Sequence, residues 1–419
     1  MSLGQRLETL RGIGPGFDHL RIGLALSILT WHSVSISYGQ AYAATLPRFP
    51  IPVLLGALLP MFFGLSGFLV MGSAIRTGEL KTFITFRVLR ILPALFTEIM
   101  LSALVLGPWL TVLPLGRYFT SPMLFEYFGS LVGRVRFSLP GLFLTNPAPE
   151  LVNFALWTVG PEILCYVLMA LLMLTGAYRR RRVMVGVAAG YLLVALVAGW
   201  LFPARAMGEV LPGKLLIWGF LAGNLLFLFR DRIRYSALLA VAAFLAAMAI
   251  LFLAQARAED WLACLAIPLF VYAVAVVGLS RLPPLPFFRR GDYSYGIYIF
   301  GFPIQQAITW FLPHHRIWYV NLAIALPLTL AFAVASWHLI EKPALSLRKR
   351  IVRREGAPIP AGGGFAVRRW ALGVALGLYG LFVIDAAAVL PLRSGGKMLL
   401  YGVGLYHYKA GDIRMFMPG

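Results

Sequence analysis

Long apolar stretches recur along almost the whole chain, and short polar segments rich in arginine separate them. A helix that crosses a bilayer needs about 20 predominantly apolar residues. The pattern therefore predicts an all-α, polytopic integral membrane protein. Eleven membrane-spanning helices are expected, near residues 20–38, 53–73, 88–110, 153–175, 183–202, 213–229, 235–255, 261–280, 293–312, 318–340 and 369–391.

The composition supports membrane insertion. Of the 419 residues, 60% are hydrophobic and 13% are charged, and the mean hydropathy is +0.81. Soluble domains contain about 25% charged residues. Both cysteines, Cys165 and Cys264, lie in apolar stretches, which argues against a disulfide or a metal site. The first apolar stretch has no small-residue cleavage site and many spans follow it, so we expect no cleaved signal peptide.

The distribution of basic residues predicts the orientation in the membrane. With the N-terminus in the cytoplasm, 25 of the 37 lysines and arginines fall on the cytoplasmic side, as the positive-inside rule requires. An odd number of spans then places residues 392–419 outside, and residues 349–368 form a cytoplasmic linker. The net charge of +21 is spread over alternate short loops, so topology accounts for it and nucleic-acid binding is not expected.

Two ionisable residues of the first predicted span, Arg21 and His32, project from the same face of the helix. Eleven residues at about 100° each return to within roughly 20° of one direction, and the two residues lie about 16 Å apart along the axis. An ionisable group inside a span is costly and is by default a sign of function. The alternative interpretation is a histidine that a neighbouring helix satisfies.

Two further motifs each allow a structural and a functional interpretation. Arg87 and Arg90 lie three residues apart at the cytoplasmic start of the third span, where they either mark the helix end or bind one anion together as a phosphate clamp. Gly64 and Gly67, within FFGLSGF, either allow close helix packing or line a passage for a slender ligand chain.

The segment VNFALWTVGPEILCY places Glu162 inside an apolar span. Pro161 cannot donate a backbone hydrogen bond, so we expect the helix to kink there. A carboxyl in this position needs a partner such as an imidazole, or else it forms a structural hydrogen bond between helices. The tyrosines at 293, 295 and 298 are typical of an interfacial belt, and His338 is expected to pack against its neighbours.

Taken together, these motifs resemble the membrane acyltransferase-3 family, bacterial enzymes that O-acylate cell-surface glycans and related acceptors. The matching motifs follow the family order over roughly residues 15–348: FDHLR, FFGLSGF, FRVLRILPAL, LPGLF, VNFALWTVGPE, SYGIYIFGFPI and IEKPAL. The resemblance implies a ten-helix acyltransferase bundle over residues 1–348 that binds acyl-CoA from the cytoplasmic side. The apolar pattern adds a further helix at 369–391. Two departures stand out. Many relatives carry a histidine where this chain has Gly301, and the roughly 28 residues after the last helix are too few for the hydrolase-like domain of some relatives.

The resemblance also implies a site. His32 would correspond to the essential histidine, Arg21 to its paired basic residue, and Arg87 with Arg90 to the arginine pair assigned to the donor. Ser66 and Gly67 are expected to join the donor site, and no metal is expected. Glu162 is expected to orient His32 or to raise its basicity. The remaining residues expected to bind substrate are Asp18, Asn153, Trp157, Tyr166, Tyr295 and Tyr298.

The predicted function is transfer of an acyl group, acetyl above all, from acyl-CoA to a hydroxyl of an exopolysaccharide, an O-antigen or a lipid-linked sugar at the bacterial inner membrane. His32 would remove the hydroxyl proton. The imidazole acts on the acceptor directly or first accepts the acyl group itself. The alternative function is a proton-coupled transporter or flippase for a glycolipid, in which His32 and Glu162 relay protons. No internal repeat supports that alternative, and it leaves the arginine pair without a role.

Overall fold

The computed structural model describes residues 1–10, 14–39, 42, 49–201, 213–257, 260–283 and 291–347. These residues form helices, turns and loops without a named strand, so the predicted all-α, polytopic class is confirmed. A helix overlaps each of the first ten predicted spans. The number of helices that cross the membrane stays a prediction. The expected linker, additional helix and tail, residues 349–368, 369–391 and 392–419, lie outside the described residues.

Most of the described chain is contained in long helices. They are α2 (Gly16–Tyr38), α3 (Ile51–Thr77), α4 (Leu80–Leu101), α8 (Val159–Leu174), α9 (Arg181–Leu201), α10 (Gly213–Leu228), α11 (Ala237–Arg257), α12 (Asp260–Gly278), α13 (Ser294–Phe311) and α14 (Trp318–Ser336). Short helices are α1 (Leu3–Thr9), α5 (Gly107–Leu110), α6 (Leu115–Thr120) and α7 (Pro122–Phe128). Seven segments of the described part are long and apolar enough to cross a membrane: 16–38, 51–77, 80–110, 154–174, 237–257, 261–278 and 318–347.

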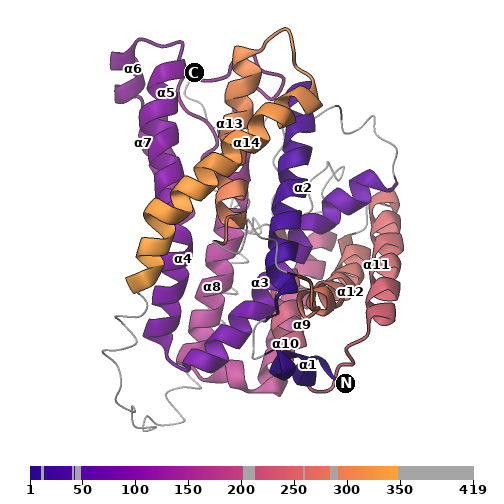
Figure 1. Cartoon of the computed structure of the whole chain (residues 1–419). Coiled ribbons are helices and arrows are strands. Elements are labelled where there is room, and N and C mark those ends of the chain that lie inside the picture. Colours follow the sequence, from indigo (N-terminus) through magenta and orange to yellow (C-terminus); the bar gives the residue numbers. More distant parts are fainter. Residues whose placement is uncertain are drawn as a thin grey trace.

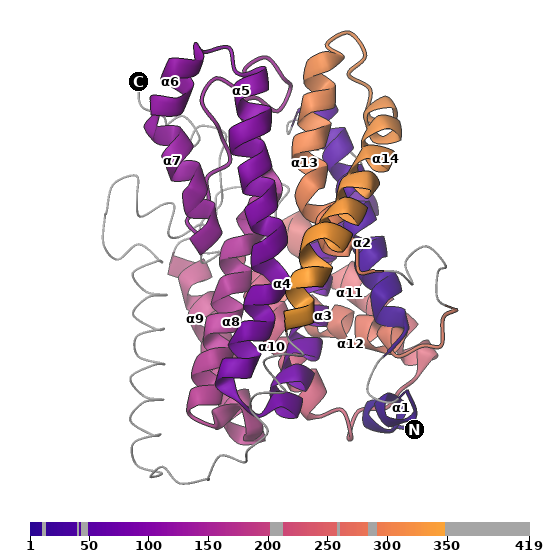
Figure 2. The same cartoon turned by 60° about the vertical axis from the view of Figure 1, so that its left-hand side comes forward.

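The helices lie in a bundle whose two ends differ (Figure 1 and Figure 2). At one end α1 contacts the turn between α10 and α11, where the amide of Leu3 donates to the carbonyl of Ile233 at 2.8 Å. The helices α5, α6 and α7 and the turn that joins α13 to α14 lie at the opposite end. Because α13 packs against α2, α14 and α4, its residues can reach side chains from all three helices.

Two glycines bring α3 and α10 into backbone contact. A Cβ added at Gly67 would lie 2.0 Å from the carbonyl oxygen of Phe220, and one added at Gly223 would lie 2.2 Å from the carbonyl oxygen of Gly64. No side chain larger than hydrogen fits at either position without moving a backbone. The structure thus favours the packing interpretation of FFGLSGF, and Gly67 faces α10 rather than a passage.

The predicted kink at Pro161 is wrong. Residues Phe154–Thr158 form a 3-10 turn, and α8 begins only at Val159. Pro161 therefore lies in the first turn of α8, where a helix needs no backbone donor and a proline does not distort it. The consequence is that Glu162 also lies in the first turn of α8 and not in the middle of a continuous helix.

Candidate functional site

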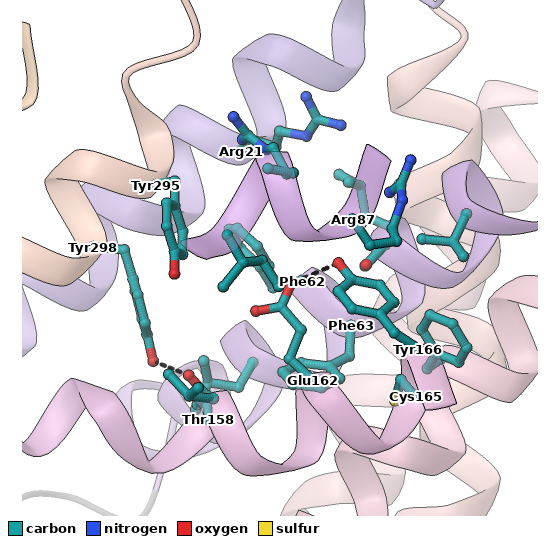
Figure 3. A pocket seen from close by; sticks show the side chains of 18 of the residues that line it. Arg21, Phe62, Phe63, Arg87, Thr158, Glu162, Cys165, Tyr166, Tyr295 and Tyr298 are labelled. Carbon is teal, nitrogen blue, oxygen red and sulfur yellow. Dashed lines mark hydrogen bonds between the residues drawn. The ribbon is translucent and has the colours of Figure 1, made fainter. Parts of the chain in front are cut away.

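A cavity of about 90 Å³ lies where α2, α3, α4, α8, α10 and α13 meet. One side of the cavity carries guanidinium groups, and the opposite side carries the hydroxyls of Tyr298 and Thr158 (Figure 3). Its lining residues are Arg21, Leu59, Phe62, Phe63, Leu65, Ser66, Leu69, Val70, Arg87, Arg90, Ile91, Ala155, Thr158, Val159, Glu162, Cys165, Tyr166, Phe220, Tyr295, Tyr298 and Ile299. The cavity therefore brings together eight of the thirteen residues that the sequence predicts for the site.

Two of the arginines share one carboxylate. Arg90 donates from Nη2 to Oδ2 of Asp292 at 2.7 Å, and Arg21 donates from Nη1 to the same oxygen at 3.0 Å. Arg21 Nη1 also lies 3.6 Å from an oxygen of Asp18, and Arg90 Nη1 lies 3.9 Å from an oxygen of Glu341. Asp18 thus lies close to Arg21, but Asp292 binds both Arg21 and Arg90 more closely.

Asp292 is itself fixed from a third direction. Its Oδ1 accepts hydrogen bonds from the hydroxyl of Ser294 at 2.6 Å and from the Ser294 amide at 3.3 Å. Burial alone would raise the pKa of Asp292, but the two guanidiniums and the hydrogen bonds from Ser294 outweigh burial and hold the pKa well below its ordinary value. Asp292 is therefore an anion at any physiological pH.

Arg87 is held by a hydroxyl and by aromatic rings. It donates from Nη2 to Oγ of Ser73 at 3.3 Å, and its guanidinium lies 5.6 Å from the ring centre of Phe83 and 5.8 Å from that of Tyr166. Throughout the described ranges, Arg87 forms no ion pair with a carboxylate, and its Nε has no hydrogen-bond partner. Its charge is consequently available to an anion that enters the cavity.

Polar groups also occupy the inner part of the cavity. The hydroxyl of Tyr166 donates to Oε1 of Glu162 at 2.7 Å, one turn apart on α8. The hydroxyls of Tyr298 and Thr158 lie 2.9 Å apart and join α13 to the turn before α8. Figure 3 shows the Glu162 carboxyl in the space between Tyr166 on one side and Tyr295 and Tyr298 on the other. The hydroxyl of Tyr295 is buried without a hydrogen-bond partner among the described residues.

Asn153 and Trp157 are buried in the segment next to the cavity. The side chain of Asn153 accepts from the amide of Ala155 at 3.1 Å and donates to the carbonyl of Ile299 at 2.9 Å, so it caps the 3-10 turn and ties that turn to α13. Trp157 is 5% exposed and belongs to the core. Both residues lie in the right segment, but neither lines the cavity.

His32 lies outside the cavity lining. Its ring packs edge-on against Phe302, with ring centres 5.0 Å apart, and Phe302 follows the lining residue Ile299 by three positions on α13. In the part of the chain that the structure describes, no side chain makes a hydrogen bond to the imidazole. Glu162 has Tyr166 as its hydrogen-bond partner, so the structure does not bring Glu162 and His32 together as the sequence analysis expected.

Sequence reasoning did not single out the partly buried carboxyl of Asp292 or the buried carboxyl of Glu98. Helix periodicity does not identify Asp292, because this residue precedes α13. Its arginine partners, Arg90 and Arg21, lie some 200 residues or more away along the chain. Glu98 is 1% exposed on α4, and its Oε1 accepts from Ser102 Oγ at 2.8 Å. An isolated acid in an apolar span is the signal that selected Glu162, and the same rule identifies Glu98.

The arrangement fits an anionic ligand with a slender, less polar extension. Guanidiniums bind phosphate or carboxylate groups with paired, directional hydrogen bonds. Beyond them the walls are largely apolar and aromatic, with a few hydroxyls and one carboxyl that can orient a ligand.

Comparison with known proteins agrees with the motif-based resemblance. The family model described as an acyltransferase domain matches residues 15–340. An O-acetyl transferase of Shigella phage Sf6 is 24% identical over 361 residues, which cover 79% of this chain and 96% of the phage protein. Nodulation protein 10 of Rhizobium leguminosarum bv. viciae is 28% identical over 392 residues, which cover 84% of this chain and 99% of that protein. No solved structure matches the chain significantly.

Proposed function

Because this chain belongs to the acyltransferase-3 family, we propose that it moves an acyl group, acetyl above all, from acyl-CoA to a hydroxyl of a cell-surface polysaccharide or a lipid-linked sugar. The chain is a multi-pass membrane protein and an O-acyltransferase. We propose four further points: the donor, the acceptor, the location in the bacterial inner membrane and the role of each residue.

The observation that carries the proposal is the group of three guanidiniums on one side of the cavity. Coenzyme A carries several phosphates at one end and a thioester at the end of a long flexible arm. We assign Arg21, Arg87 and Arg90 to the phosphates, on the cytoplasmic side of the membrane. Arg87 supports this assignment best, because its charge is not matched by a carboxylate ion pair among the described residues. The arm would then enter between Ser66 and the tyrosines of α13.

The hydrogen-bonded pair of Glu162 and Tyr166 suits the arm of the donor. That arm contains amides, and a carboxyl and a hydroxyl can accept from and donate to them. Since Glu162 is hydrogen-bonded to Tyr166, we propose that this pair orients the donor and does not activate the imidazole of His32.

We propose His32 as the base for the transfer step. Its imidazole takes the proton of the acceptor hydroxyl as the hydroxyl oxygen bonds to the thioester carbonyl carbon. The carbon–sulfur bond then breaks, and the leaving thiolate receives that proton, which yields the ester and free CoA. The role requires a path from the cavity to the imidazole past the contact between His32 and Phe302. The support for His32 is its family motif and its position on the same helix as Arg21.

The acceptor is proposed to approach from the side opposite the arginines. The phage relative bears the name of an O-acetyl transferase, which supports a hydroxyl as the group that receives the acyl chain. Tyr295 and Tyr298 are proposed to contact either the arm or the acceptor, because both line the cavity.

The proposal is tested with the purified full-length protein in lipid nanodiscs. Acetyl-CoA is supplied together with cell-envelope polysaccharide, and both free thiol and polysaccharide-bound acetyl are measured. We expect both products to form at equal rates and only when the acceptor is present. Transport of a glycolipid across the bilayer without any thiol release would instead favour the transporter alternative.

A further inference from the structure

Asp292 binds two of the three arginines that line the cavity. A single oxygen of its carboxylate receives hydrogen bonds from Arg90 at 2.7 Å and from Arg21 at 3.0 Å. Both arginines line the cavity, whereas Asp292 does not. The side chains of all three residues are about a quarter exposed, at 24%, 25% and 20%, so an incoming anion has access to the pair.

Asp292 also connects the two arginines to the start of α13. Its Oδ1 is bonded to the hydroxyl and the amide of Ser294, the first residue of α13. The next residue, Tyr295, has its ring 5.9 Å from the guanidinium of Arg90 and lines the cavity. A shift of the Asp292 carboxylate therefore acts on the start of α13 and on Tyr295.

The size of the cavity indicates that the donor needs such an opening. The cavity holds about 90 Å³, whereas pockets for ligands the size of a drug or a cofactor measure about 300–1,000 Å³. The arm of coenzyme A therefore enters only if side chains that line the cavity separate. The hydrogen bonds of Asp292 join Arg21 of α2 and Arg90 of α4 to the start of α13, and all three helices contribute to the lining.

We propose that Asp292 is a positioning residue that holds the place of a donor phosphate at Arg21 and Arg90, and that a phosphate must displace it before the cavity admits the acyl-bearing arm. This inference rests on the proposed function, because it requires a phosphorylated donor. A phosphate carries more negative charge and more acceptor oxygens than a carboxylate, so it competes well for the same guanidiniums. While no donor is bound, Asp292 keeps two partly buried positive charges paired.

The consequence is that the protein selects thioesters that carry phosphates. Part of the free energy with which the phosphates bind is used to open the cavity, and a thioester without phosphates cannot supply this free energy. The protein should therefore prefer acetyl-CoA strongly over S-acetyl-pantetheine, which has the same arm and acyl group but lacks the phosphorylated nucleotide. Removing the charge of Asp292 should reduce that preference.

The test compares the wild-type protein with Asp292→Asn, both full-length and in nanodiscs, with acetyl-CoA and with S-acetyl-pantetheine as donors. We expect the KM for acetyl-CoA to fall about fivefold, because the variant removes the carboxylate charge that competes with the donor for two partly exposed guanidiniums. We also expect kcat/KM for S-acetyl-pantetheine to rise by more than about fivefold, so that the ratio of the two kcat/KM values narrows. Ser294→Ala, which removes the hydroxyl donor to the other oxygen of Asp292 and keeps the backbone amide, should change both quantities in the same direction by less.

The control variant is Glu126→Gln, which removes the charge of a distant ion pair, 2.9 Å from Arg136, and should leave both donors unaffected. A higher KM for acetyl-CoA in Asp292→Asn would show that the carboxylate only positions the arginines for the donor. An unchanged ratio of the kcat/KM values for the two donors would equally contradict displacement of Asp292 by a phosphate. CoA binding by the wild-type protein is measured separately. Failure of the wild-type protein to bind CoA would overturn the proposed donor itself, together with the inference that rests on it.

Discussion

Arg21, Arg87 and Arg90 carry the same charge at the same side of the cavity, but the structure holds them in two different ways. Arg21 and Arg90 are paired with Asp292, whereas Arg87 lies against Ser73 and two aromatic rings. A partly buried guanidinium is costly unless it is paired or hydrogen-bonded. Arg87 is therefore the residue whose charge is most readily assigned to a ligand.

His32→Ala tests the proposed base at the residue scale. General base catalysis contributes about 10²–10⁴-fold, so we expect acyl transfer to fall by at least about a hundredfold. Acetyl-CoA binding should change little, because the ring of His32 does not line the cavity. The measurement is polysaccharide acetylation at saturating donor. His315→Ala, in the turn before α14, is the matched control, and full acetylation by His32→Ala would rule out the imidazole as the base.

The sequence singles out the three arginines that line the cavity, but it does not single out Asp292, the carboxylate that binds two of them. Arg21, Arg87 and Arg90 follow from helix periodicity and spacing, which are local properties. The pairing with Asp292 is not local, because it depends on how the start of α13 packs against α2 and α4. For the same reason the sequence suggests Glu162 as a partner for His32, whereas the hydrogen bond of Glu162 goes to its neighbour on the next turn, Tyr166.

At the scale of elements, the contact between α3 and α10 depends on glycine. The structure resolves the two interpretations of FFGLSGF, because an added Cβ at Gly67 meets a backbone oxygen of α10. The start of α8 could not be predicted as well. The sequence pattern does not tell whether Pro161 lies inside a helix or in its first turn, and the structure shows that a 3-10 turn ends at Thr158 and that α8 begins at Val159.

Gly67→Ala should weaken this helix contact. The added methyl group forces the two backbones apart, at a cost of about 1–3 kcal/mol for overpacking. Gly186→Ala is the matched control, since an added Cβ on α9 meets nothing within 4 Å and alanine is the better helix former by about 1 kcal/mol. Thermal unfolding in detergent should show a lower Tm for Gly67→Ala only. Equal Tm values for the two variants would contradict the close contact.

At the scale of the whole molecule, hydropathy predicts the helices, while their orientation in the membrane depends on charge. The basic turn between α10 and α11 contacts α1, and α5–α7 lie at the opposite end (Figure 2). Because cytoplasmic loops are rich in lysine and arginine, we expect the end with α1 to face the cytoplasm.

Cysteine labelling tests this orientation. The two native cysteines are buried, so a membrane-impermeant thiol reagent should leave them unmodified in the folded protein. Thr120→Cys, at the end of α6, should be labelled in intact cells. Arg232→Cys, in the turn after α10, should be labelled only after the membrane is permeabilised. The reverse pattern would invert the topology and place the arginines of the cavity on the outer side.

The central claim is that the arginine side of the cavity binds the phosphates of an acyl-CoA donor, and its most direct test is the Kd for CoA of Arg87→Gln. This variant leaves no carboxylate without its ion pair in the described structure, so the fold should persist. Loss of a charge-assisted contact to phosphate should raise the Kd about tenfold or more. Arg117→Gln, on α6, is the control and should bind like the wild type. A Kd for Arg87→Gln equal to that of the wild-type protein, with the fold intact, would contradict the account.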